Sequence, residues 1–196
     1  METAIILNSP SISREIAETH VICADGGYKN LRDVKPSVIV GDMDSISHLP
    51  NDIKLIKLPT EKNLSDGEFA VRYAHENGFS KIVLYGILGG RIDHVLCNLA
   101  LMKLANSLGL DVVAKEDGLN VHFVNGECDL SVKKGTTISI LPYAGEAIVT
   151  SSQGLYYPLE NLTLTTSDTR GLSNVATAEK IHFSVTKGDV LVFQYI

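Results

Sequence analysis

Two aspartates separated by one residue, Asp42 and Asp44, are the side chains of this sequence best suited to binding a cation. They stand in Gly41-Asp42-Met43-Asp44-Ser45, directly behind the apolar run 38–40. On an extended segment, side chains two positions apart point the same way, and like charges held that close repel unless a cation lies between them. A pair of carboxylates suits Mg²⁺, which in proteins commonly carries phosphates. Taken alone, the motif also fits an ordinary solvated turn.

Three further polar motifs follow apolar runs in the same half of the chain. Asp25-Gly26-Gly27 follows the run 20–24, the segment 61–68 follows 53–58, and the segment 89–94 follows 81–86. In a parallel sheet, ligands bind beyond the carboxyl ends of the strands, which meet at one edge. We therefore expect the four motifs to converge on one site.

Each of these motifs also has a purely structural interpretation. Asp25-Gly26-Gly27 fits a turn, and Ser65 followed by Glu68 fits a capping box at the start of a helix. A carboxylate at Asp66 would complement the helix dipole. Gly89-Gly90 with Arg91 could cradle a phosphate, although the motif matches no general nucleotide-binding fingerprint. His94 alone indicates a core or capping histidine.

The alternation of short apolar runs with helical periodicity predicts an α/β domain over residues 1–118. We expect a mostly parallel sheet with helices on both faces. Predicted strands are 4–7, 20–24, 38–40, 53–58, 81–86 and 111–114, and predicted helices are 12–19, 65–77 and 92–108. Gly78 and Gly109 stand where helix C-terminal caps belong.

The second half predicts a small all-β antiparallel sandwich over residues 119–196. Short strands separated by turn residues are typical of such a domain. Predicted strands are 120–124, 130–132, 136–141, 147–151, 162–166, 181–185 and 190–195. A domain of this size is near the lower limit for an independent core, so we expect it to lean on the first domain or on a second subunit.

Composition narrows the class of protein. The 196 residues are 44% hydrophobic and 20% charged, and the net charge of −6 argues against a nucleic-acid partner. No apolar run approaches a membrane span, and the N-terminal residues lack the pattern of a secretory signal. Cys23, Cys97 and Cys128 show no metal-type spacing, which favours a reducing, cytoplasmic location.

As a set, these motifs resemble the thiamin pyrophosphokinase (thiamin diphosphokinase) family over nearly the whole chain. The resemblance rests on the Asp-Gly-Gly, Gly-Asp-x-Asp-Ser, Glu-Lys-x-x-Ser-Asp and Gly-Gly-Arg-x-Asp-His motifs, with Asn98 after the last of them. In the second half it continues with the segments 154–159 and 171–174. The family implies transfer of pyrophosphate from ATP to the hydroxyl of thiamin, with Mg²⁺, to give thiamin diphosphate and AMP. It also implies a homodimer with the thiamin site at the subunit interface.

The resemblance assigns roles to individual residues. Asp42, Asp44 and Asp66 would bind Mg²⁺, and Asp93 would act beside them as a catalytic residue. The nucleotide side would be formed by Asp25, Gly26, Lys62, Gly90, Arg91 and His94. The thiamin side would be formed by Asn98, Tyr157, Ser173 and Asn174.

Two positions depart from the family pattern. Asn63 stands where the family usually has Asp, and Val175-Ala176 stands where an acidic residue is common. The first removes one negative charge from the expected site. Two alternatives therefore stay open: a related ATP-dependent kinase of another small alcohol, and a low-activity protein that binds thiamin or nucleotide.

Overall fold

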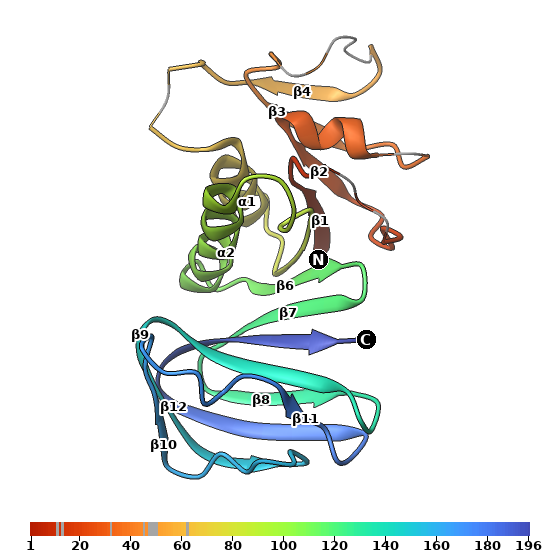
Figure 1. Cartoon of the computed structure of the whole chain (residues 1–196). Coiled ribbons are helices and arrows are strands. Elements are labelled where there is room, and N and C mark those ends of the chain that lie inside the picture. The colour runs from red at the N-terminus through yellow and green to blue at the C-terminus, as the bar shows by residue number, and fades with distance from the viewer. Residues whose placement is uncertain (11, 13, 32, 45, 47–50, 62) are drawn as a thin grey trace. The chain divides into compact units, whose positions relative to one another are not determined.

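The computed structural model divides the chain into two compact units, Met1–Asp117 and Gly118–Ile196 (Figure 1). It describes all residues except 11, 13, 32, 45, 47–50 and 62. Within the described residues, no helix is both long enough and apolar enough to cross a membrane.

The first unit is built on a parallel sheet. Its strands lie in the order β6-β5-β1-β2-β3-β4, and each neighbouring pair is parallel. The strands are β1 (Glu2–Ile6), β2 (Val21–Ala24), β3 (Val38–Gly41), β4 (Lys54–Lys57), β5 (Lys81–Tyr85) and β6 (Asp111–Glu116). The central strands β1, β2, β3 and β5 are almost entirely buried, as expected when both faces of a sheet are covered.

Two kinds of structure cover this sheet. Helices α1 (Asp66–Glu76) and α2 (Ile92–Ser107) lie side by side, and α1 packs against β1, β2 and β3 (Figure 1). Ala4 and Ile6 of β1 instead pack in a cluster with Tyr28, from the 3-10 helix η1 (Asp25–Asn30). Because neighbouring residues of a strand face opposite sides, η1 and the segments beside it cover the face away from α1. The α/β prediction is confirmed.

The predicted helix over 12–19 is wrong, because the described residues of that segment form no helix. Ile12 and Ile16 both pack into the core cluster, which explains why their spacing resembled a helical stripe. The segment is held by side chains from the sheet. The Tyr85 hydroxyl donates to Glu18 Oε2 (2.8 Å), and Lys115 Nζ lies 3.0 Å from Glu18 Oε1.

The two α-helices begin and end where the sequence predicts. Ser65 is the N-cap of α1, and its Oγ accepts a hydrogen bond from the Glu68 amide (3.1 Å). Glu68 then pairs with Arg72 one turn later. Gly78 and Gly109 follow the C-caps of the two helices with φ of 77°, a left-handed conformation that glycine adopts without strain.

The second unit is an antiparallel β structure, which confirms the predicted change of architecture. The strand order is β10-β9-β12-β7, with β8 paired to β12 and β11 paired to β9. The strands are β7 (Leu119–Val124), β8 (Glu127–Ser131), β9 (Thr137–Gln153), β10 (Leu162–Leu164), β11 (Asn174–Val175) and β12 (Lys180–Tyr195).

Two long strands replace four of the predicted short ones. The gaps between the predicted strands 136–141 and 147–151 and between 181–185 and 190–195, which contain Ala144-Gly145 and Lys187-Gly188, lie inside β9 and β12. There the pairing shifts register between Asp189–Tyr143 and Lys187–Ile148, and Ala144 and Gly188 have positive φ. The turn residues therefore form irregularities in a continuous ladder, which bend the strands rather than end them.

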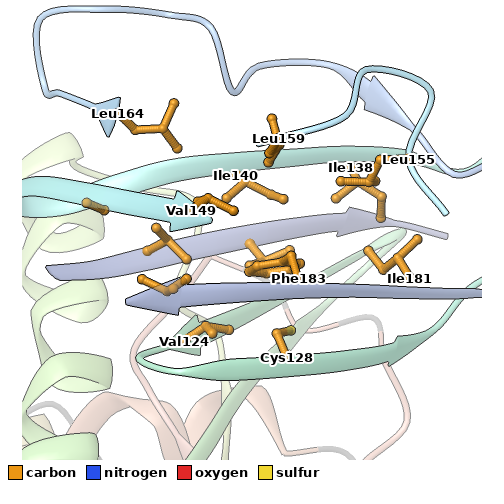
Figure 2. Packing of buried hydrophobic residues seen from close by; sticks show 14 of the residues in the cluster. Val124, Cys128, Ile138, Ile140, Val149, Leu155, Leu159, Leu164, Ile181 and Phe183 are labelled. Atoms are coloured by element: carbon orange, nitrogen blue, oxygen red, sulfur yellow. The ribbon is translucent and has the colours of Figure 1, made fainter. Parts of the chain in front are cut away.

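This unit has a hydrophobic core of its own (Figure 2). Phe183 and Ile181 of β12 are fully buried, together with Ile138 and Ile140 of β9. Leu155 and Leu159, from the irregular segment after β9, are part of the same cluster. The core thus fixes the start of the segment in which the family resemblance places thiamin-binding residues.

Candidate functional site

A cavity of about 520 Å³ lies in the first unit, where β1, β2 and β3 end and where α1 and α2 begin. This is the edge at which parallel sheets bind ligands. Its lining residues are Leu7, Asn8, Ala24, Asp25, Asp42, Asp44, Ser65, Asp66, Gly67, Asp93, His94, Cys97, Asn98 and Leu101. The four polar motifs of the sequence therefore each contribute to one cavity.

Three carboxylates are close together in this cavity. One oxygen from each of Asp25, Asp42 and Asp44 lies within 4.8 Å of the other two. Asp25 is buried, Asp42 is half-buried and Asp44 is exposed, so the cluster reaches from the sheet edge to the surface. Carboxylate oxygens are the ligands that Mg²⁺ prefers, and this cluster can hold a divalent cation.

The convergence of Asp42 and Asp44 arises from a turn and not from strand alternation. Strand β3 ends at Gly41, and Met43 has a φ of 67°. The buried Met43 side chain packs into the core cluster, while the Asp44 amide lies 3.3 Å from Asp42 Oδ1. The expected geometry of an extended segment is therefore wrong, although the two carboxylates do meet.

Asp25 is held in an unusual conformation at the start of η1. Its φ of 36° is strained for a residue other than glycine. Its side chain is buried, and its Oδ1 accepts no hydrogen bond from any residue that the structure describes. A buried carboxylate oxygen without a partner is costly, and a bound cation would satisfy it. The donor set and this oxygen both fit Mg²⁺.

Asp66 lines the same cavity but is not one of the three clustered carboxylates. It is the first residue of α1, directly after the Ser65 cap. Gly67 follows it, and a Cβ at Gly67 would lie 2.8 Å from the Leu101 side chain of α2. A larger residue beside Asp66 would therefore have to displace the Leu101 side chain.

The first turns of α2 bring a second group of polar side chains to the cavity. Arg91 and Asp93 form an exposed ion pair, and Asp93 Oδ1 also accepts from the His94 amide (3.0 Å). The hydrogen bonds from Arg91 lower the pKa of Asp93, so this carboxyl is ionised at neutral pH. Asn98 lines the cavity while its Nδ2 donates to the Ile87 carbonyl (3.1 Å).

Several predicted residues are not among those that line the cavity. Gly26 packs against the Asn8 side chain, Gly90 lies in the loop before α2, and Arg91 occupies the N-cap position of that helix. Lys62 lies outside the described residues. Asn8 also lines the cavity, although it belongs to none of the four motifs. It follows Leu7, the residue after β1, and a polar residue behind a strand is the same signal that marks the other site residues.

The remaining predicted residues belong to the second unit. Asn174 is buried, and its side chain makes two hydrogen bonds to the backbone of Tyr157: its Oδ1 accepts from the amide (3.0 Å) and its Nδ2 donates to the carbonyl (2.7 Å). Tyr157 itself is 61% exposed. Ser173 has a φ of 57°, and its amide donates to Ser139 Oγ (3.0 Å). Asn174 therefore fixes the backbone that presents Tyr157.

Both units match families of known proteins. The family described as "Thiamin pyrophosphokinase, catalytic domain" matches residues 15–114, and "Thiamin pyrophosphokinase, vitamin B1 binding domain" matches residues 127–190. The chain is 27% identical over 184 residues to "Thiamine pyrophosphokinase" of Bacillus subtilis, which covers 88% of this chain and 86% of that protein.

Solved structures show the same fold. The thiamine pyrophosphokinase of Bacillus subtilis superposes with a TM-score of 0.87 at 22% identity, over 100% of this chain and 99% of that chain. The thiamin pyrophosphokinase of Candida albicans gives 0.79 at 18% identity, over 100% and 90%. At this level of identity, the structures establish the common architecture of both units.

Proposed function

The chain belongs to the thiamin pyrophosphokinase family, and on that premise we propose that the carboxylate-lined cavity is where the pyrophosphate transfer takes place. The family's reaction moves a pyrophosphate from ATP to the hydroxyl of thiamin and releases AMP. The thiamin oxygen forms a bond to the β-phosphorus, and the bond from that phosphorus to the oxygen of AMP breaks. The observation that carries the proposal is the cluster of Asp25, Asp42 and Asp44.

We assign Asp25, Asp42 and Asp44 as the residues that would hold Mg²⁺, with Asp66 at the wall of the same cavity. When bound, the ion would neutralise phosphate charge, which is the main requirement of phosphoryl-type transfer. The strained turns at Asp25 and Met43 support this role, because such conformations gather at functional sites. Asp25, expected on the nucleotide side, thus joins Asp42 and Asp44 in the proposed metal set.

Asp93 is proposed to orient the thiamin hydroxyl and to accept its proton. Its ion pair with Arg91 and its hydrogen bond from the His94 amide fix the carboxylate at the cavity wall. Its lowered pKa makes it a weak base, so the proton would transfer late, as the bond to phosphorus forms. Arg91 and His94 are proposed to face the phosphates, as the family resemblance implies.

The thiamin side is proposed to form between two copies of the chain. Two exposed apolar surfaces support a homodimer. In the first unit, Ile92 and Leu96 of α2 are 76% and 61% exposed beside the cavity residue Asp93. In the second unit, Tyr156, Tyr157 and Leu172 are exposed beside Ser173 and Asn174. Aromatic faces attract cations, which suits the thiazolium ring of thiamin.

We propose that the enzyme works in the cytoplasm. Cys23, Cys97 and Cys128 are all free thiols, and a reducing compartment keeps them so.

The experiment that tests the function is incubation with ATP, Mg²⁺ and thiamin, followed by separation of the nucleotide products. Thiamin-dependent formation of AMP and thiamin diphosphate in equal amounts is the expected result. Formation of ADP would instead indicate a kinase that transfers a single phosphate. Thiamin binding by calorimetry without turnover at any Mg²⁺ concentration would indicate a binding protein.

A further inference from the structure

The loop between β5 and α2 leads into Arg91 and His94, the residues proposed to face the phosphates, and it is rich in glycine. Gly86, Gly89 and Gly90 all have positive φ, between 68° and 86°. Such glycines allow tight turns but leave the backbone free to adopt other conformations. The loop lies against the segment after β1, since a Cβ at Gly86 would be 2.9 Å from the Leu7 carbonyl oxygen.

A carboxylate from the neighbouring strand binds an amide of this loop. The Ile87 amide donates to Glu116 Oε1 at 2.6 Å, and Glu116 is the last residue of β6. Burial raises the pKa of Glu116, whereas the amides of Ile87, Leu88 and Gly86 favour its ionised form. The hydrogen bond from the Ile87 amide therefore ties the loop to a buried side chain at the end of β6.

Other contacts fix the same peptide groups from the opposite direction. Ser9 Oγ donates to the Leu88 carbonyl (2.8 Å), and Asn98 Nδ2 donates to the Ile87 carbonyl (3.1 Å). Glu116 is itself anchored, because Arg14 Nη1 donates to its backbone carbonyl (3.2 Å). An amide and two carbonyls of the loop are therefore engaged, and Glu116 supplies the carboxylate of this set.

We propose that Glu116 is a positioning residue for the pyrophosphate transfer: it fixes the loop 86–90 and thereby the placement of Asp93 at the cavity and of its ion-pair partner Arg91. This proposal rests on the proposed function of the cavity. Glu116 is not among the residues that line the cavity, so it acts through the loop and not on the reacting groups. Small displacements of such groups lower the reaction rate strongly, since a misplacement of about 1 Å can reduce it by roughly 100-fold.

The test compares Glu116→Ala and Glu116→Gln with the unaltered protein by two measurements. Amide hydrogen exchange monitored by NMR reports the protection of Ile87, and steady-state kinetics report kcat and KM for ATP and for thiamin. In Glu116→Ala we expect faster exchange at Ile87 and a loss of roughly 10-fold or more in kcat/KM for ATP. Glu116→Gln keeps one acceptor for Ile87 but loses the charge, so an intermediate effect is expected.

Glu18→Gln is the matched control. Glu18 is also a buried carboxylate of the first unit, with a side chain 4% exposed, and it accepts from Tyr85 and Lys115, not from the loop. We expect this variant to lower the melting temperature without changing Ile87 exchange or KM for ATP.

Unchanged Ile87 exchange in Glu116→Gln would overturn the proposal, as would kinetic constants that match those of Glu18→Gln. The exchange measurement needs no turnover, so it separates this proposal from the assignment of the cavity. If the unaltered protein formed no AMP, the proposed function would fail independently of what exchange shows about the loop. If Glu116→Ala does not fold, the Gln variant still decides the outcome.

Discussion

Gly41 approaches Asp25 so closely that a Cβ placed on Gly41 would lie 2.7 Å from the Cβ of Asp25. The end of β3 therefore supports the side chain that begins η1. We expect Gly41→Ala to displace Asp25 from Asp42 and Asp44 and to reduce kcat by roughly 10-fold or more, because positioning of charged groups dominates this chemistry. The measurement is turnover as a function of Mg²⁺ concentration.

Gly145→Ala is the control for this change. Gly145 has a similar φ, 139° against 151° at Gly41, but a Cβ there would have no described atom within 4 Å. Both variants introduce comparable backbone strain, and only one of them introduces a clash. Equal loss of turnover in the two variants would show that strain, and not the position of Asp25, is responsible.

The hydrogen bonds between Asn174 and Tyr157 predict that a change at Asn174 affects the binding of thiamin and not of ATP. Asn174→Ala removes both bonds to the backbone of Tyr157, which are partly buried, and we expect the loss to cost about 1–3 kcal/mol in the free energy of unfolding. We also expect KM for thiamin to rise while KM for ATP is unchanged. Asn125→Ala, at an exposed asparagine of the same unit, should change neither constant. An unaltered KM for thiamin would remove Tyr157 from the substrate site.

A substitution at Asn63 tests whether turnover can be increased. Asn63 is exposed, it is not among the residues that line the cavity, and it stands where the family usually has Asp. We expect Asn63→Asp to leave turnover unchanged or to raise it, with any gain greatest at low Mg²⁺, because the change restores the carboxylate that the family usually has in the motif that leads to Asp66. Kinetics across a range of Mg²⁺ concentrations measure this. A clear fall in turnover would contradict the expectation.

The exposed apolar residues of α2 predict how the chain assembles. Leu96→Glu places a charge on the surface proposed to meet a second copy, and we expect the sedimentation coefficient to fall to that of a monomer. Asn106→Glu, at an exposed polar position of the same helix, should leave the dimer intact. If the unaltered chain already sediments as a monomer, the proposed subunit interface is wrong.

The pattern of apolar residues predicted the fold correctly wherever an apolar run fitted only one kind of secondary structure. The buried strands of the first unit and both α-helices follow from short apolar runs, caps and glycines. The helix prediction for 12–19 failed because Ile12 and Ile16 have helical spacing. Both pack into the core from an irregular segment, which is bound to Tyr85 and Lys115 through Glu18. Contacts of that kind join residues far apart in sequence, so local periodicity does not contain them.

The candidate site was predictable as a set of residues but not as a geometry. The position of each motif behind a strand was enough to expect that the carboxylates would meet. The left-handed turn at Met43 and the burial of Asp25 were not predictable, because both depend on packing against the core. Family resemblance could name Asn174 as a substrate residue, whereas the structure shows its side chain bound to the backbone of Tyr157.

Replacement of Asp25, Asp42 and Asp44 by asparagine, one at a time, tests the proposed site most directly. Each variant keeps the shape of the side chain and removes one charge, and Asp111→Asn at the opposite end of the sheet is the control. Turnover with ATP, thiamin and Mg²⁺ should fall by at least about 100-fold in each of the three variants, with little change in melting temperature, whereas the control should stay active. Near-normal turnover in both Asp42→Asn and Asp44→Asn would contradict the assignment of this cavity to pyrophosphate transfer.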